Sequence, residues 1–240
     1  MTQEKTSATE SFLGLSLCLF ALFLYSFSAC AAKRKSTIEI PEGSSGIVAY
    51  GSLISMPSME QTLGHKYQGP VHQIHLTGYE REWTCVRPFN DPRANSADAP
   101  RINASLLLGN ERVPLSGTAE LNIHPKKNGR INAILYLIDD ADVSGLDKRE
   151  WGYQRVDVTD KIEEFRFRGG KVYVYEGIPG RADGSSTEKG TYILIKEFAD
   201  LVAGACDGRE KNFRDEFDKS TKPCEYPVVS YKEIVWEKAK

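Results

Sequence analysis

The chain has 240 residues and a formal net charge of −2, with 40% hydrophobic and 27% charged residues. Such a composition is typical of an ordinary globular protein with one large domain or two small ones. Because the charge is close to neutral, there is no broad basic surface of the kind that binds nucleic acid, and we expect no nucleic-acid partner.

Residues 1–32 are expected to lie outside the folded domain as a membrane-targeting segment. Phe12 to Ala32 contains no charged residue and, at 21 residues, is long enough to cross a bilayer, which takes about 20. Cys30 follows Phe27-Ser28-Ala29 as the lipidated cysteine follows a bacterial lipobox, whereas Lys33-Arg34-Lys35 would keep the C-terminal side in the cytoplasm. A lipoprotein signal, an uncleaved single-pass anchor and a cleaved signal peptide therefore stay open, and they disagree about the side of the membrane.

The next residues, 33–45, are expected to form a polar linker, followed by a folded domain at 46–221 and a C-terminal extension at 222–240. Gly46 to Tyr50 predicts a short buried strand that runs into the turn Gly51-Ser52-Leu53 and then a helix, Ser58 to Leu63. Such a turn presents backbone N–H groups that can hold an anion, and the glycine lets the backbone approach a ligand closely.

Further strands are predicted where apolar residues run together or alternate. They cover Gln73–Val86 with a bulge at Gly78, Ile102–Leu108, Thr118–Ile123, Ile131–Ile138, Tyr153–Val158, Ile162–Arg168, Lys171–Glu176 and an edge strand within Tyr226–Trp236. The turn residues Gly109-Asn110, Lys127-Asn128-Gly129 and Gly169-Gly170 lie between such strands and predict hairpins, while helical spacing predicts Glu188–Cys206 and Asn212–Lys219. Many strands followed by helices indicate an α+β fold.

The cysteines and histidines give no metal-ligand spacing. Beyond residue 32 the cysteines are Cys85, Cys206 and Cys224, so either Cys206 pairs with Cys224 or all three are free thiols. His72 and His75 lie three apart in an extended run and point to opposite faces. We therefore expect no metal and no cofactor, and neither a phosphate-binding loop nor a dinucleotide fingerprint is present in the sequence.

Glu150 is the first candidate for chemistry. It follows a short polar segment that Asp139 or Asp140 would cap as a helix, and it precedes the strand at Tyr153. Beside Trp151 and Tyr153 its carboxylate would be partly desolvated, and a raised pKa makes it a better base near neutral pH. The alternative is that Glu150 pairs with Arg149 or Arg155 on a solvated face.

Two stretches together resemble the γ-glutamylcyclotransferase superfamily. The first is Tyr50-Gly51-Ser52-Leu53, a motif whose sequence is similar to that of the glutathione-specific branch. The second is Leu146-Asp147-x-Arg149-Glu150-x-Gly152-Tyr153-x-Arg155. The resemblance spans about Gly46 to Thr221 and implies a small mixed β-barrel with peripheral helices, in agreement with the α+β interpretation.

The resemblance also implies a reaction and a set of roles. The α-amino group of a small γ-glutamyl substrate attacks its own γ-amide, closes the 5-oxoproline ring and releases an amine or a peptide, without metal or cofactor. Glu150 would be the general base, and the backbone N–H groups of Tyr50, Gly51, Ser52 and Leu53 would bind the glutamyl head and the oxyanion. Tyr153 or Tyr175 would line the pocket or donate a hydrogen bond.

The rival hypothesis is a membrane-anchored ligand-binding protein that keeps this fold but has no turnover. The oligomeric state and the leaving group of the substrate are open at this stage.

Overall fold

The structure is a computed structural model, and it describes residues 35–89, 91, 102–179, 191–210 and 212–238. They belong to a structural unit that begins at Lys35. The predicted membrane-targeting segment and Cys30 lie outside the described residues, so their roles stay predictions. Among the described helices, none is long and apolar enough to cross a bilayer.

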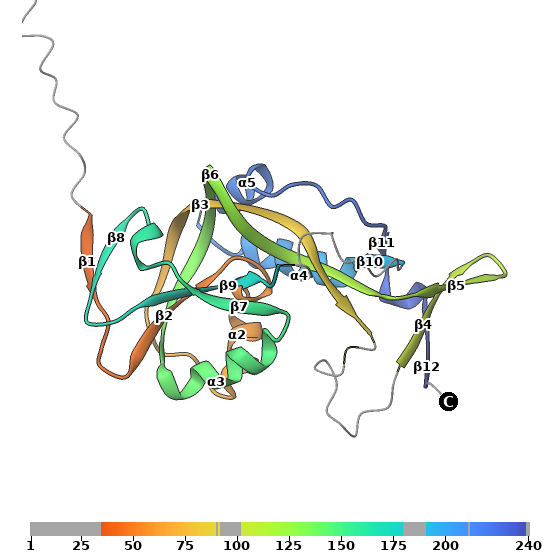
Figure 1. The fold of residues 1–240 in the computed structure, drawn as a ribbon, viewed down its shortest axis with the longest axis horizontal. Coiled ribbons are helices and arrows are strands. Elements are labelled where there is room, and N and C mark those ends of the chain that lie inside the picture. Colours follow the sequence, from red (N-terminus) through yellow and green to blue (C-terminus); the bar gives the residue numbers. More distant parts are fainter. Residues whose placement is uncertain (1–34, 90, 92–101, 180–190, 211, 239–240) are drawn as a thin grey trace, which may run out of the picture. The chain divides into compact units, whose positions relative to one another are not determined.

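The largest sheet is organised around the long strand β6 (Gly117–Asp139), as Figure 1 shows. Its neighbours follow in the spatial order β11 (Val228–Val229), β10 (Tyr192–Ile195), β6, β2 (Ser44–Ala49), β9 (Val172–Gly177) and β7 (Tyr153–Asp157), and β3 (Val71–Pro88) also pairs with β6. An isolated bridge joins Leu76 of β3 to Ile162 in the segment after β7. The sheet and its helices confirm the predicted α+β class.

The core is formed by the central strands. Ile47 of β2 and Ile134 and Leu135 of β6 have no exposed surface, and Leu146 packs into the same cluster from a helix. Burying each such side chain stabilises the fold by about 1.5–3 kcal/mol relative to leaving it exposed, so these strands fix the frame on which the site is built.

The strand β6 corrects one predicted hairpin. The turn expected at Lys127-Asn128-Gly129 does not exist, because β6 continues through it and stays paired with β3. The pairing register shifts between Thr77 and Tyr79, where Gly78 has φ +81° and Asn128, on the opposite strand, has φ +63°. The residues that are typical of a turn therefore form a bulge, as predicted for Gly78, and not a chain reversal.

Four α-helices in the described part of the chain accompany the sheet, and three match their predicted places. They are α2 (Met56–Leu63), α3 (Asp140–Arg149), α4 (Lys196–Asp207) and α5 (Phe213–Lys219). The helix predicted from Glu188 to Cys206 is wrong in its first part, because Tyr192–Ile195 is strand β10. Ile193 and Leu194 of β10 are both buried, Ile193 beside Thr118 of β6 and Leu194 beside Val228 of β11, so pairing with neighbouring strands overrides the helical spacing of the sequence.

The predicted linker also contains structure. Strand β1 (Ser36–Glu39) pairs in parallel with β8 (Phe165–Arg168), although Ile38 is its only apolar residue and the sequence gives no alternation there. Since β8 pairs with β1 and β9 pairs with β2 and β7, the hairpin expected at Gly169-Gly170 is wrong.

A second sheet joins the middle of the chain to its end. Its strands are β12 (Ile234–Lys238), β4 (Ile102–Leu108) and β5 (Glu111–Leu115), in that order, so the predicted turn at Gly109-Asn110 and the C-terminal edge strand are confirmed.

Cys85, Cys206 and Cys224 are free, which decides between the two alternatives for the thiols.

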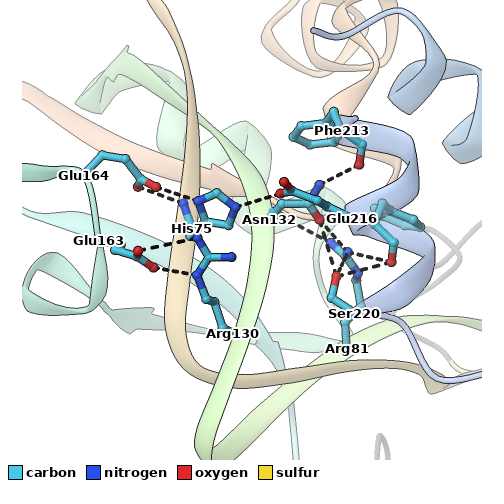
Figure 2. Close-up of polar contacts among 10 residues, drawn as sticks. His75, Arg81, Arg130, Asn132, Glu163, Glu164, Phe213, Glu216 and Ser220 are labelled. Carbon is cyan, nitrogen blue, oxygen red and sulfur yellow. Dashed lines mark hydrogen bonds and ion pairs between the residues drawn. The ribbon is translucent and has the colours of Figure 1, made fainter. Parts of the chain in front are cut away.

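Helix α5 is attached to the sheet by a buried cation. The guanidinium of Arg81, on β3, has no exposed surface and donates to the carbonyl and side-chain oxygens of Asn132 on β6 (Figure 2). It also donates to Phe217 O and Ser220 Oγ at the C-terminal end of α5, and it lies 3.7 Å from the centre of the Phe217 ring. Carbonyl oxygens at a helix C-terminus favour a cation, so the charge fixes α5 against β3 and β6.

A second contact, centred on His75 of β3, holds the same helix. His75 Nδ1 lies 2.6 Å from Glu164 Oε1 and Nε2 lies 2.9 Å from Glu216 Oε2 of α5, as Figure 2 shows. Arg130 pairs with the neighbouring Glu163 at 2.6 Å. Only the protonated imidazole donates from both nitrogens, so this geometry favours the charged form. The hydrogen bond with Glu164 raises the pKa of His75 above its ordinary value of 6.5.

We therefore predict that His75 makes stability depend on pH. The folded chain holds the His75 proton more tightly than the unfolded chain, so this stabilisation is fully present below about pH 6.5 and is lost as pH rises through the folded pKa. In equilibrium urea unfolding, His75→Gln should lower the free energy of unfolding by more at pH 6 than at pH 9. His72→Gln is the matched control, because burial lowers the pKa of His72 and its effect should have the opposite slope. If His75→Gln lowers the free energy of unfolding equally at both pH values, a charged His75 between Glu164 and Glu216 is contradicted.

Candidate active site

A cavity of about 250 Å³ lies where β2 runs into the short helix η1 (Ser52–Ile54) and α3 turns into β7. All seven residues that the sequence marked for the active site line this cavity, namely Tyr50, Gly51, Ser52, Leu53, Glu150, Tyr153 and Tyr175. The remaining lining residues are Val48, Ala49, Arg87, Glu120, Leu121, Arg149 and Phe198. The two sequence stretches, about a hundred residues apart, therefore meet at one place.

Glu150 lies at the C-terminal end of α3, where the chain turns back into the sheet as predicted. Its backbone N–H donates to Leu146 O and its own carbonyl accepts from the N–H of Tyr153, both at 2.8 Å. This tight turn directs the side chain into the cavity, where only 12% of it is exposed. The alternative of a solvated surface carboxylate is wrong, although the pairing with Arg149 that it assumed is present at 3.1 Å.

Arg149 holds the parts of the site in place. Its Nε donates to Glu150 Oε1, its Nη1 donates to Thr62 Oγ1 at 2.6 Å, and its Nη2 donates to Ser58 Oγ at 2.9 Å and Ser52 Oγ at 3.1 Å. One guanidinium thus joins α2, the Gly-Ser turn and the candidate base. A planar fork with five donors can do this, whereas a lysine ammonium cannot match the geometry.

Arg87 and Glu120 are cavity residues that the sequence did not reveal. Arg87 comes from β3 and Glu120 from β6, and Arg87 Nε lies 3.0 Å from Glu120 Oε2. Arg87 Nη2 also lies 3.8 Å from Glu150 Oε2, and its guanidinium faces the rings of Trp151 at 5.1 Å and Tyr153 at 5.6 Å. In the sequence, Arg87 is only a charged residue at the end of one predicted strand, and Glu120 is only a charged residue within another. Their closeness can be inferred only once the pairing of β3 with β6 is known.

Burial shapes the charge of both carboxyl groups. It raises the pKa of Glu150 above its ordinary value of 4.5, against the opposing effect of Arg87 and Arg149, and the charge of Glu120 adds to the rise. Burial likewise raises the pKa of Glu120, again against the two arginines. Two carboxyl groups of raised pKa in one cavity are suited to accepting and donating protons near neutral pH.

The three tyrosines form walls of the cavity and have hydrogen-bond acceptors of their own. The hydroxyl of Tyr50 donates to Tyr175 O at 2.7 Å, that of Tyr153 to Leu121 O at 2.6 Å, and that of Tyr175 to Asp147 Oδ1 at 2.7 Å. Of the two roles expected for Tyr153 and Tyr175, the geometry favours lining the pocket, because their hydroxyl protons are already donated to other acceptors in the protein.

The Gly51 turn is open toward the cavity. Ile54 N–H donates to Gly51 O and Ser55 N–H donates to Ser52 O, so the N–H groups of Ser52 and Leu53 precede the first helical bond and are available to a ligand. Gly51 has φ −136° and ψ −132°, and an added Cβ would lie 3.6 Å from Leu121, a cavity residue. A side chain at this position would therefore narrow the cavity.

Two groups of His and Glu residues elsewhere lie close enough to consider as metal ligands. They are His75, Glu163 and Glu164, and Glu80, Glu82 and His124. In each group a basic side chain already pairs with the carboxylates, since Arg130 pairs with Glu163 and Lys222 lies against both Glu80 and Glu82. Neither group lines the cavity.

Comparison with known proteins gives similarity to solved structures only. No family model matches the sequence, and no curated protein does. A γ-glutamyl cyclotransferase matches at 8% identity over 79% of this chain and 95% of that one, with a TM-score of 0.47. An uncharacterised protein from Homo sapiens matches at 11% identity over 80% and 96%, with a TM-score of 0.45. YkqA from Bacillus subtilis matches at 15% identity over 74% and 54%, with a TM-score of 0.49.

The first of these structures belongs to the family that the two sequence stretches resemble.

We predict that Arg149→Met raises the pKa of Glu150 further, because the positive charge of Arg149 opposes the rise caused by burial. A carbon-13 NMR titration of the Glu side-chain carboxyls would measure this shift. Arg155→Met is the matched control, since Arg155 belongs to the same stretch but pairs with Asp147 at 3.6 Å. An unchanged or lowered Glu150 pKa in Arg149→Met would contradict the assigned contact.

Proposed function

We propose that this protein is a γ-glutamylcyclotransferase-like enzyme that converts a small γ-glutamyl amine or peptide to 5-oxoproline and releases the amine. The observation that supports this most strongly is Glu150, a mostly buried carboxyl of raised pKa that faces the Gly51-Ser52-Leu53 turn across a small cavity. The resemblance of both sequence stretches to that superfamily adds support. No cofactor is needed for this reaction.

The cavity supplies what an intramolecular cyclisation requires. The substrate carries its own nucleophile, so the protein has to fold it into a reactive geometry, which contributes several kcal/mol through effective molarity. Glu150 accepts a proton from the α-ammonium group, and the amine then attacks the γ-carbonyl carbon. The N–H groups of Ser52 and Leu53 are placed to stabilise the oxyanion or to bind the α-carboxylate.

The set of lining residues favours proton transfer over covalent catalysis. It contains no histidine and no cysteine, and the hydroxyl of Ser52 accepts a hydrogen bond from Arg149. Cys85 lies nearby but is buried, and burial raises its pKa to about 12, so its thiol stays protonated and unreactive. Activation of a protein nucleophile is therefore poorly supported by this cavity.

The ligand-binding alternative has one observation in its favour. Glu150 is paired with Arg149 and faces Arg87, and these contacts favour its charged form as a structural partner. A γ-glutamyl compound would then bind without reaction. Substitution of Glu150 separates the two functions.

Glu150→Gln should lower kcat by about 10²–10⁴-fold while the substrate still binds, because a neutral amide cannot accept the ammonium proton. In the unmodified protein kcat/KM should rise with pH, with its midpoint above the ordinary carboxyl value of 4.5, because burial raises the pKa of Glu150. Both are measured by the rate of 5-oxoproline formation from γ-glutamyl substrates.

Glu176→Gln is the matched control, because Glu176 is also a largely buried glutamate, accepts from the Tyr79 hydroxyl and does not line the cavity. Its rate should stay close to that of the unmodified protein. An unmodified protein that binds γ-glutamyl compounds and forms no 5-oxoproline would favour the ligand-binding alternative.

A further inference from the structure

The cavity holds a second carboxyl group that the proposed reaction has not yet used. Glu120 projects from β6, whereas Glu150 ends α3, so the two reach the cavity from different elements. They contact neighbouring nitrogens of one guanidinium, Nε and Nη2 of Arg87, at 3.0 and 3.8 Å. A single cation therefore lies beside both carboxyl groups in one cavity.

Glu120 lies beside Arg87 but accepts no aligned hydrogen bond from Arg87 Nε, so this contact does not require Glu120 to be ionised. Arg87 Nε is close enough to Glu120 Oε2 for an ion pair, yet its N–H does not point along the line to that oxygen. By contrast, Glu150 accepts an aligned hydrogen bond from Arg149 Nε. With 22% of its side chain exposed, Glu120 is also more accessible than Glu150, at 12%. It is the freer of the two groups to exchange a proton with a ligand.

The proposed cyclisation needs more than one proton transfer. The α-ammonium group loses one proton before it attacks and a second after the new C–N bond forms. The departing nitrogen must gain a proton, because an unprotonated amide ion is a very poor leaving group. A cavity with one proton acceptor and one proton donor meets both needs.

We propose that Glu120 is the general acid that protonates the departing amine, an inference that rests on the proposed cyclotransferase function. Ionised Glu150 takes the first proton from the α-ammonium group, and the freed amine attacks the γ-carbonyl, whose π electrons move to the oxygen. Glu120 gives its proton to the departing nitrogen as the old C–N bond breaks, and the resulting carboxylate takes the second proton from the ring nitrogen. Glu150 then passes its proton to the released amine or to water, and both groups return to their starting states.

A comparison of two substrates distinguishes a Glu120 that acts as general acid from a Glu120 that only positions Arg87. A γ-glutamyl alkylamine has a basic departing nitrogen that must be protonated, whereas γ-glutamyl-p-nitroanilide departs with little protonation. Glu120→Gln should slow 5-oxoproline formation from the alkylamine by about 10²-fold or more and slow the nitroanilide by less than about 5-fold. Glu150→Gln should slow both substrates alike, and Glu176→Gln should slow neither.

The pH profile provides a second measurement. With the alkylamine, kcat/KM of the unmodified protein should fall again at high pH as Glu120 loses its proton, and this falling limb should be absent in Glu120→Gln. If Glu120→Gln slows both substrates equally and keeps the falling limb, Glu120 only positions Arg87 and this proposal is overturned. If the unmodified protein forms no 5-oxoproline from either substrate, the proposed function itself fails, which is a different result.

Discussion

Arg81 carries its charge in the interior of the protein, and the geometry of the candidate site depends on how that charge is satisfied. Burial lowers its pKa to about 9, still above neutral pH, so the guanidinium stays charged. Removing a cation from water costs several kcal/mol, which the surrounding oxygens of Asn132, Phe217, Ser220 and Thr221 offset. A further hydrogen bond reaches Tyr50 O, at the point where β2 leaves the sheet for the Gly51 turn. One buried cation thus fixes both α5 and the start of the cavity.

The stretch from Leu146 to Arg155 is the second element of this arrangement, and its Asp147, Arg149 and Glu150 make different contacts. Asp147 accepts from the Tyr175 hydroxyl and pairs with Arg155, which stabilises the wall of the cavity. Arg149 joins this stretch to α2 and to Ser52, and only Glu150 is left with its carboxyl group facing the cavity. The residues that resemble a known superfamily therefore have a physical reason to occur together, since losing one would misplace the others.

The sequence predicted the local part of the site well and the long-range part poorly. Glu150 and the Gly51 turn could be found because each follows a strong local signal, a helix end in one case and a strand end in the other. Arg87 and Glu120 could not, because their closeness depends on the register of β3 against β6, two strands whose pairing passes through the bulge at Gly78. The pairing of β3 with β6 also explains the wrong hairpin at Lys127-Asn128-Gly129, and the pairing of β10 with β6 and β11 explains the strand in place of a helix at Tyr192 to Ile195. Tertiary partners decided these segments, and local propensity did not.

In the proposed cyclisation the α-amine of the substrate, and not water, attacks the γ-amide carbon. An isotope experiment tests this directly. A γ-glutamyl dipeptide that carries ¹⁵N at the α-amino group is incubated with the purified protein in ¹⁸O-water and analysed by mass spectrometry against a protein-free control. We expect 5-oxoproline that retains ¹⁵N in its ring and contains no ¹⁸O. Glutamate that contains ¹⁸O would show hydrolysis by water, and recovery of unchanged dipeptide would show no turnover; either result would contradict cyclisation by the α-amine.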